Sequence, residues 1–389
     1  MSQSDANSAG EPAPDQLRQV KARKYAKSRR YLASGNLSLA AILLLLLVFG
    51  GLSLRLTGLF DLPTVPLAVV YFAILVIAYE VLSAPLSYYQ GFVLPHRYGL
   101  SVQRFNGWLG DEAKTGVISL TLGAGIVAAV YWFITSFPQM WWLLSWALII
   151  LLSLILANLA PRIIGALFFK MTPLSDTDLK LRLEQLAQRA GTNVSGVYTI
   201  ELSSKGTMAN AALIGLGNTK RIVLSDTLLQ RYSPLEIEII TAHELGHYLH
   251  NDIFRLFVVQ SAIWLVGFYV TDIALRVSVV PLGFNSISDV AALPLLMLIF
   301  AVFSLLVAPL ARAYSRHREV VADEYALRLT DDPKSFINAM TRLTDQNLSE
   351  AQPSRWVELL LYNHPSYSKR VEHARYYSSH SLNRQGEGK

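Results

Sequence analysis

The residues best suited to chemistry lie between Thr241 and His250, where His243, Glu244 and His247 form the pattern His-Glu-x-x-His. Residues four positions apart lie on one face of an α-helix, so His243 and His247 can present both imidazoles to one metal ion. Two imidazoles and a third protein ligand suit zinc, whose fourth position then stays open to water. The neighbouring carboxylate of Glu244 can take a proton from that water. The pattern therefore indicates hydrolysis of a peptide bond with Glu244 as general base.

The residues before this motif predict the helix that it requires. Ser233 and Glu236 match a capping box, and Pro234 occupies the first helical position. The alternative interpretation is a surface helix that carries two ordinary histidines. Because a helix running from Pro234 to His250 presents the motif in the required geometry, we favour the metal site.

A metal held by two imidazoles needs a third ligand. A third histidine six residues after His247 is absent, because Ile253 occupies that position. A glutamate from another helix is the other common solution. Glu319 and Asp323 are four residues apart on one face of a predicted helix, so we take Glu319 as the third ligand and Asp323 as the hydrogen-bond acceptor that orients a ligand imidazole.

Two alternatives stay open for this helix on spacing alone. Glu324 is the rival third ligand. The segment can also be a charged helix at the membrane surface, whose carboxylates pair with Arg312 and Arg316.

The composition is that of a membrane protein. Of the 389 residues, 52% are hydrophobic and 16% are charged, which is too apolar for an ordinary soluble protein. The chain has no cysteine, so disulfides, thiolate metal ligands and cysteine nucleophiles are excluded. A net charge of +6 also occurs in nucleic-acid-binding proteins, but here the basic residues lie beside apolar segments. Membrane topology explains this charge better, so we expect no nucleic-acid partner.

Six apolar segments are long enough to cross a bilayer as helices. They comprise approximately residues 37–54, 65–82, 116–137, 141–159, 254–275 and 293–310. A cytoplasmic N-terminus places residues 162–255 and the chain from Arg312 onward on the inner side, and leaves only Arg55 and Arg276 outside. We therefore predict a multi-pass integral protein of a bacterial inner membrane, with the His243 helix on the cytoplasmic side.

The chain divides into four regions in this interpretation. Residues 1–35 form a disordered tail that ends in a basic cluster, and residues 36–172 form a membrane region with four spans. Residues 173–330 carry the His-Glu-x-x-His helix and the last two spans. Residues 331–389 form a cytoplasmic helical segment that completes the site.

The polar insert between the fourth and fifth spans predicts a small α/β unit. Its helix covers residues 176–190 and is stopped by Gly191, and a strand covers residues 197–200. Residues 208–214 and 221–224 predict a hairpin around Gly217 and Asn218. A strand edge beside the metal site can hold a peptide in extended form, although the hairpin can equally serve only to support the helix.

Three motifs taken together resemble peptidase family M48. They are His-Glu-x-x-His at 243–247, Glu-x-x-x-Asp at 319–323, and Asn-His-Pro-Ser at 363–366 followed by Arg370. Asn210 and the stretch 221–229 resemble the substrate-binding strand of that family and the residues after it. Residues 90–94 and 97–100 resemble the N-terminal block of the Ste24 branch, the CAAX prenyl protease type.

This resemblance implies a fold, a cofactor and roles for single residues. The fold is mainly α: a polytopic helical membrane protein of about six spans, with a cytoplasmic gluzincin-type zinc protease domain that contains a small β-hairpin or sheet. The partners are the lipid bilayer and a peptide or protein substrate, prenylated or membrane-associated. One zinc ion per chain would be held by His243, His247 and Glu319, with Glu244 as base, Asp323 orienting a zinc-bound histidine, His364 and Arg370 steadying substrate and oxyanion, and Asn210 holding substrate backbone.

Two other functions remain open at this point. One is a quality-control protease of the HtpX type, although that branch has fewer spans and lacks a long N-terminal membrane block. The other is a non-enzymatic membrane protein with structural zinc. A structural site usually has four protein ligands, and the sequence offers no obvious fourth.

Overall fold

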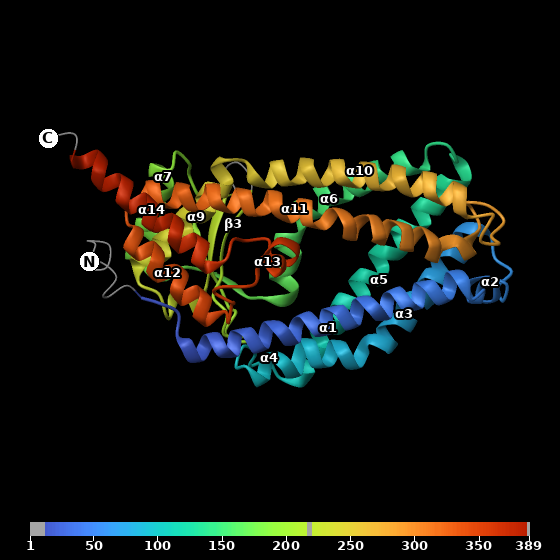
Figure 1. The fold of residues 1–389 in the computed structure, drawn as a ribbon, viewed down its shortest axis with the longest axis horizontal. Coiled ribbons are helices and arrows are strands. Elements are labelled where there is room, and N and C mark those ends of the chain that lie inside the picture. The colour runs from blue at the N-terminus through green and yellow to red at the C-terminus, as the bar shows by residue number, and fades with distance from the viewer. Residues whose placement is uncertain (1–11, 216–219, 387–389) are drawn as a thin grey trace.

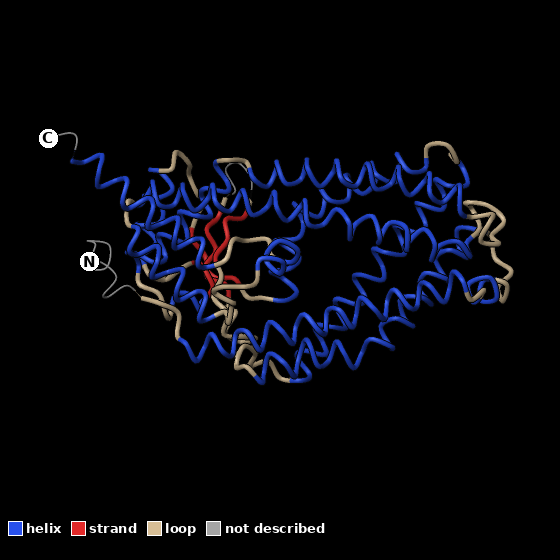
Figure 2. The backbone as a smooth tube through the Cα atoms, viewed as in Figure 1, coloured by secondary structure: helices blue, strands red, loops and turns tan. Residues whose placement is uncertain are grey.

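The computed structural model describes residues 12–215 and 220–386, which form a long helical array with a small sheet near one end (Figures 1 and 2). The α-helices are α1 (Gln16–Phe49), α2 (Leu52–Thr57), α3 (Thr64–Tyr88), α4 (Leu94–Arg97), α5 (Phe105–Ser136), α6 (Trp141–Phe168), α7 (Thr177–Arg189), α8 (Asp226–Leu229), α9 (Pro234–Leu249), α10 (Asp252–Ser278), α11 (Leu293–Thr330), α12 (Pro333–Gln346), α13 (Arg355–Leu361) and α14 (Tyr367–Gly386). A π-helical turn, Tyr89–Val93, joins α3 to α4, and a 3₁₀ turn, Val290–Ala292, precedes α11.

Six described helices are long and apolar enough to cross a membrane, which confirms the six predicted spans. They are α1, α3 with its continuation to Arg97, α5, the first part of α6, α10, and α11 with the turn before it. The sheet, α9, α12, α14 and the start of α1 lie at one end of this array, and α2 and the α10–α11 connection lie at the other (Figure 1). An even number of spans between the two ends of the chain is consistent with this arrangement.

The expected disordered tail is wrong for residues 16–35, because α1 begins at Gln16, where the side chain of Asp15 caps it. Residues 1–11 lie outside the described residues. The basic cluster is helical because Lys, Arg and Gln favour helices and because this part of α1 has partners elsewhere in the chain. Its Arg30, for example, pairs with Glu350, which lies 320 residues away.

The insert forms a mixed four-stranded sheet of order β1-β2-β4-β3. The strands are β1 (Met171–Pro173), β2 (Val197–Ile200), β3 (Ala211–Ile214) and β4 (Arg221–Ser225). β3 and β4 pair antiparallel with Ala211 opposite Leu224, which confirms the hairpin, while its turn lies outside the described residues. β4 pairs in parallel with β2, and the short β1 was not predicted. β3 is therefore an edge strand.

The hydrophobic core of this unit lies between the sheet and three helices. Leu183 of α7, Leu224 of β4, Ile237 of α9 and Phe336 of α12 are each at most 1% exposed and belong to one buried cluster. The predicted helix at 176–190 is confirmed as α7, with Asp176 as its N-cap. This packing fixes α9 against β3 on one side and against α12 on the other.

The arrangement predicts which loops share a side of the membrane. Because the chain has no cysteine, single cysteines can be introduced and labelled without background. We expect Ser204→Cys and Lys334→Cys to react with an impermeant maleimide from one face of sealed vesicles. Gln139→Cys and Asp61→Cys should react only from the opposite face. Labelling of all four from the same side would contradict the six-span arrangement.

Candidate active site

Helix α9 begins as its sequence predicts. The Ser233 hydroxyl accepts a hydrogen bond from the Glu236 backbone N–H at 3.3 Å, and the Ser233 N–H donates to Glu236 Oε2 at 2.8 Å. Both halves of the capping box are therefore present, with Pro234 at the first position. This cap sets where the helix begins and hence which face carries His243 and His247.

α9 and α11 approach closely beside the two histidines. A Cβ atom at Gly246 would lie 3.2 Å from Ala322 Cα and 3.3 Å from Ala322 O, which is tighter than ordinary contact. Ala322 itself is fully buried. A glycine facing an alanine thus lets the two helix backbones come near enough for side chains of α9 and α11 to meet.

Three potential metal ligands meet at this contact. His243 Nε2 lies 3.2 Å from His247 Nε2, and Glu319 Oε2 lies 3.3 Å from His243 Nε2. Glu319 Oε1 lies 3.4 Å from His247 Nε2. A tetrahedral zinc ion with ligands at about 2.0–2.1 Å places neighbouring donor atoms about 3.3–3.4 Å apart. The spacing of the three side chains therefore fits one tetrahedral metal ion.

The remaining nitrogen of each imidazole faces a carboxylate. His247 Nδ1 hydrogen-bonds Asp252 Oδ2 at 2.9 Å, and His243 Nδ1 lies 2.9 Å from Asp323 Oδ1. A proton held on Nδ1 leaves the lone pair of Nε2 free, and both Nε2 atoms point to the shared centre. In addition, Glu319 Oε2 is buried without a hydrogen bond of acceptable geometry. The arrangement of these donor atoms therefore suits a shared metal ion better than direct hydrogen bonds between the three side chains.

Asp252 was missed by the sequence analysis. It lies five residues after His247, at the first position of α10, and Arg318 Nε donates to its Oδ1 at 2.6 Å. Both side chains are buried, so the pair neutralises a charge that would otherwise be isolated. No motif marks Asp252, and its closeness to His247 in the chain was the one available signal.

The structure places Arg370 against Asp323. Arg370 Nε donates to Asp323 Oδ2 at 2.8 Å, and a second guanidinium N–H donates to Oδ1. The Asp323 side chain is 1% exposed. Loss of one partner of such a buried pair costs about 3–5 kcal/mol. Arg370 also lines the cleft beside the histidines, but its charge is balanced by Asp323.

Both alternatives for the α11 segment are wrong. Glu324 pairs with Arg328 on an exposed face, and it is not in the group of possible ligands formed by the described residues. Arg312 and Arg316 donate to backbone carbonyls of α13 and of the residue after it, not to Glu319 or Asp323.

A cleft of about 340 Å³ runs past these groups, lined among others by Asn210, Glu244, His364 and Arg370. Burial raises the pKa of Glu244, which lies next to His243 on α9. His364 lies on the loop between α13 and α14; its side chain is 64% exposed, and its Nδ1 lies 2.8 Å from Glu319 Oε2. Asn210 is exposed and directly precedes the edge strand β3. The cleft thus brings together every residue predicted to act on a substrate.

Comparisons with known proteins found two family models that together match most of the chain. The family model described as peptidase family M48 matches residues 173–378, and the model described as CAAX prenyl protease N-terminal, five membrane helices, matches residues 6–170. Four of the six candidate spans lie within the second match.

Individual relatives cover most of the chain. An uncharacterized metalloprotease of Bacillus subtilis (strain 168) is 33% identical over 288 residues, which is 73% of this chain and 68% of the relative. CAAX prenyl protease 1 of Saccharomyces cerevisiae is 29% identical over 319 residues, covering 77% of this chain and 70% of that protein. The crystal structure of S. mikatae Ste24p superposes with a TM-score of 0.83 at 23% identity, covering 95% of this chain and 92% of that one, so the fold is shared.

The three-ligand geometry predicts how metal content responds to substitution. Glu319→Ala and His243→Ala should each lose most of the bound metal, because two remaining protein ligands hold zinc weakly. Glu324→Ala, five residues from Glu319 on the same helix, is the matched control and should keep it. Elemental analysis of purified protein measures the outcome. Full metal occupancy in Glu319→Ala would show that the third ligand is a different residue.

Proposed function

The chain belongs to peptidase family M48, and we propose that it is a membrane-embedded zinc endopeptidase whose site faces the cytoplasm of a bacterium. The observation that carries this proposal is the meeting of His243, His247 and Glu319, with donor atoms 3.2–3.4 Å apart, at the wall of a cleft that His243 and Glu244 both line. When bound, zinc supplies a Lewis acid that polarises the substrate carbonyl and lowers the pKa of its bound water.

Glu244 is the general base of the proposed reaction. Its carboxylate accepts the proton of the attacking water and passes it to the leaving amine. Burial raises the pKa of Glu244, which makes its carboxylate a better proton acceptor than an exposed one. Its place on α9 next to His243 holds it beside the water that the three ligands position.

His364 and Arg370 support the developing negative charge in different ways. The His364 imidazole faces Glu319 Oε2 through Nδ1, and its other nitrogen, Nε2, can donate a hydrogen bond to the substrate oxygen. Arg370 holds Asp323, which in turn holds the His243 ring, so its cation acts mainly through the ligand geometry. Both residues line the cleft that would receive the scissile bond.

The substrate binds in extended form in this proposal. β3 is an edge strand, and Ala211 at its start lines the cleft together with Glu244. A substrate backbone can therefore add to the sheet through main-chain hydrogen bonds, and the Asn210 amide can hold it beside His243. The role of β3 as substrate platform, rather than as a support for α9 alone, is supported by this exposure to the cleft.

Prenylated or membrane-associated proteins are the proposed substrate class. The site lies on α9 and α11, and α11 is one of six candidate spans in the described residues; several relatives are CAAX prenyl proteases. The match of residues 6–170 to the CAAX prenyl protease N-terminal model favours this branch over a quality-control protease of the HtpX type. A group of three ligands among the described residues is also what a catalytic metal site needs, whereas a structural one usually has four.

The first test removes the base and leaves the ligands intact. Glu244→Gln keeps the size of the side chain but cannot accept a proton, so turnover should fall by about two to four orders of magnitude at unchanged metal content. The assay offers a prenylated CAAX peptide and a panel of tagged membrane proteins to pure protein. Wild-type turnover by Glu244→Gln would exclude Glu244 as base. No cleavage of any substrate by the wild type would favour a non-enzymatic role.

The second test addresses His364. His364→Ala removes one hydrogen bond to the transition state, so we expect a loss on the order of a hundredfold in kcat with metal retained. His373→Ala, on the following helix α14, controls for the loss of a histidine outside the cleft. An unchanged rate in His364→Ala would remove this residue from the mechanism.

A further inference from the structure

The loop that carries His364 is fixed on both sides of that residue. After His364, Pro365 and Ser366 are buried, and the Ser366 N–H donates to Glu358 Oε1 at 3.1 Å. Before it, the Tyr362 carbonyl accepts from Arg316 Nη1 at 2.7 Å, and the Tyr362 hydroxyl donates to Glu350 Oε2 at 3.0 Å. The exposed imidazole therefore depends on these anchors for its position in the cleft.

Glu350 receives its counter-charge from the first membrane helix. Its carboxylate is 7% exposed and lies in the wall of the catalytic cleft. Arg30 Nη1 donates to Glu350 Oε2 at 2.5 Å, and Nη2 donates to Oε1 at 3.4 Å. A buried carboxylate needs a paired cation, and Arg30 supplies it from α1. The Tyr362 hydroxyl shares Oε2 with Arg30, so three residues form one hydrogen-bonded chain.

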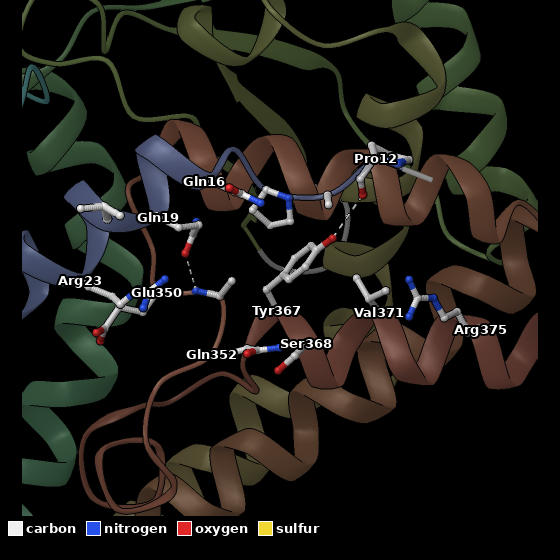
Figure 3. Close-up of a pocket in the computed structure, with 14 residues that line it drawn as sticks. Pro12, Gln16, Gln19, Arg23, Glu350, Gln352, Tyr367, Ser368, Val371 and Arg375 are labelled. Atoms are coloured by element: carbon white, nitrogen blue, oxygen red, sulfur yellow. Dashed lines mark hydrogen bonds between the residues drawn. The ribbon is translucent and has the colours of Figure 1, made fainter. Parts of the chain in front are cut away.

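The first part of α1 is docked on the segment that carries Glu350. The Gln19 amide N–H₂ group donates to the Ser349 carbonyl, and Gln19 Oε1 accepts from the Ala351 N–H at 3.0 Å. Figure 3 shows Gln19 beside this segment, close to Glu350. Leu348 adopts a left-handed backbone with φ of 47° and packs in one buried cluster with Ala22. A leucine seldom adopts this conformation, so burial of Leu348 against α1 offsets the strain of its backbone.

We propose that Arg30 and Glu350 are positioning residues for His364, acting through the Tyr362 hydroxyl. The first membrane helix thereby contributes to the active site without touching the substrate. This inference rests on the role of His364 in the proposed function. It predicts that removing a hydrogen-bonding group of Arg30, Glu350 or Tyr362 displaces His364. The ligands His243, His247 and Glu319 should stay in place.

The mildest test is Tyr362→Phe, which removes one hydroxyl and leaves Arg30 and Glu350 paired. We expect kcat to fall about tenfold, because small displacements of a catalytic group are costly, while KM changes little since the edge strand is untouched. Arg30→Gln should lower kcat at least as much, and Arg30→Lys should restore much of it by replacing the cation. Metal content should stay at the wild-type level in all three.

A double-mutant cycle separates positioning of His364 from a general effect on the fold. In a His364→Ala background, Tyr362→Phe and Arg30→Gln should lower kcat by less than twofold further, because the group that they position is gone. Lys24→Gln is the matched control: it removes one positive charge from an exposed position of the same helix and should leave kcat unchanged.

The outcomes that overturn the inference differ from those that overturn the function. If Tyr362→Phe and Arg30→Gln keep the wild-type kcat while His364→Ala is impaired, only the positioning role is overturned. The positioning role is also overturned if Tyr362→Phe and Arg30→Gln lower kcat by the same factor in the His364→Ala background as in the wild type. Arg30 and Glu350 would then act on a group other than His364. An unimpaired His364→Ala variant overturns the role of His364 itself and this inference with it.

Discussion

The close contact between α9 and α11 is the constraint on which the site depends. His243 and His247 belong to one helix and Glu319 to the other, so the distance between the helices decides whether the three donors can share a metal ion. Gly246 and Ala322 face each other at that contact, and a larger side chain at either position would push the backbones apart. The capping box that starts α9 and the core of α7, α12 and the sheet hold the helix in the required orientation. The contact between Gly246 and Ala322, which takes no part in the chemistry, thus sets the geometry of His243, His247 and Glu319.

Paired charges surround the group of potential metal ligands, His243, His247 and Glu319. Asp252 is matched by Arg318, Asp323 by Arg370, and Glu350 by Arg30. Each pair is largely withdrawn from water, where an unpaired carboxylate would be costly, and each one reaches a residue of the site. The pairs at Asp252 and Asp323 hold the imidazoles, and the pair at Glu350 reaches the His364 loop. The three ion pairs therefore orient His243, His247 and the His364 loop. Their cations come from α11, α14 and the first membrane helix.

The membrane helices and the peptidase unit are not separate modules. Residues 99–103, between α4 and α5, pair with the insert through a bridge between Ser101 and Gly206 and a hydrogen bond from the Val102 N–H to the Lys205 carbonyl. A Cβ at Gly206 would lie 2.7 Å from the Leu100 carbonyl oxygen, so only glycine allows this approach. Together with the docking of α1, these contacts connect the N-terminal membrane region to the edge of the active site.

Local patterns in the sequence determined much of this protein by themselves. Apolar length is a local property, so the six spans could be predicted, and so could the α9 cap, the hairpin and the presence of His243 and His247 on one face of α9. Charged side chains were different: neither the choice between Glu319 and Glu324 as candidate ligand nor the pairing of Arg370 with Asp323 could be settled from spacing. No sequence motif marks Asp252 or Glu350, and only the closeness of Asp252 to His247 in the chain pointed to the former. Only the tertiary structure decided these points, because a buried charge is defined by the partner that packing brings to it, and that partner can lie 320 residues away.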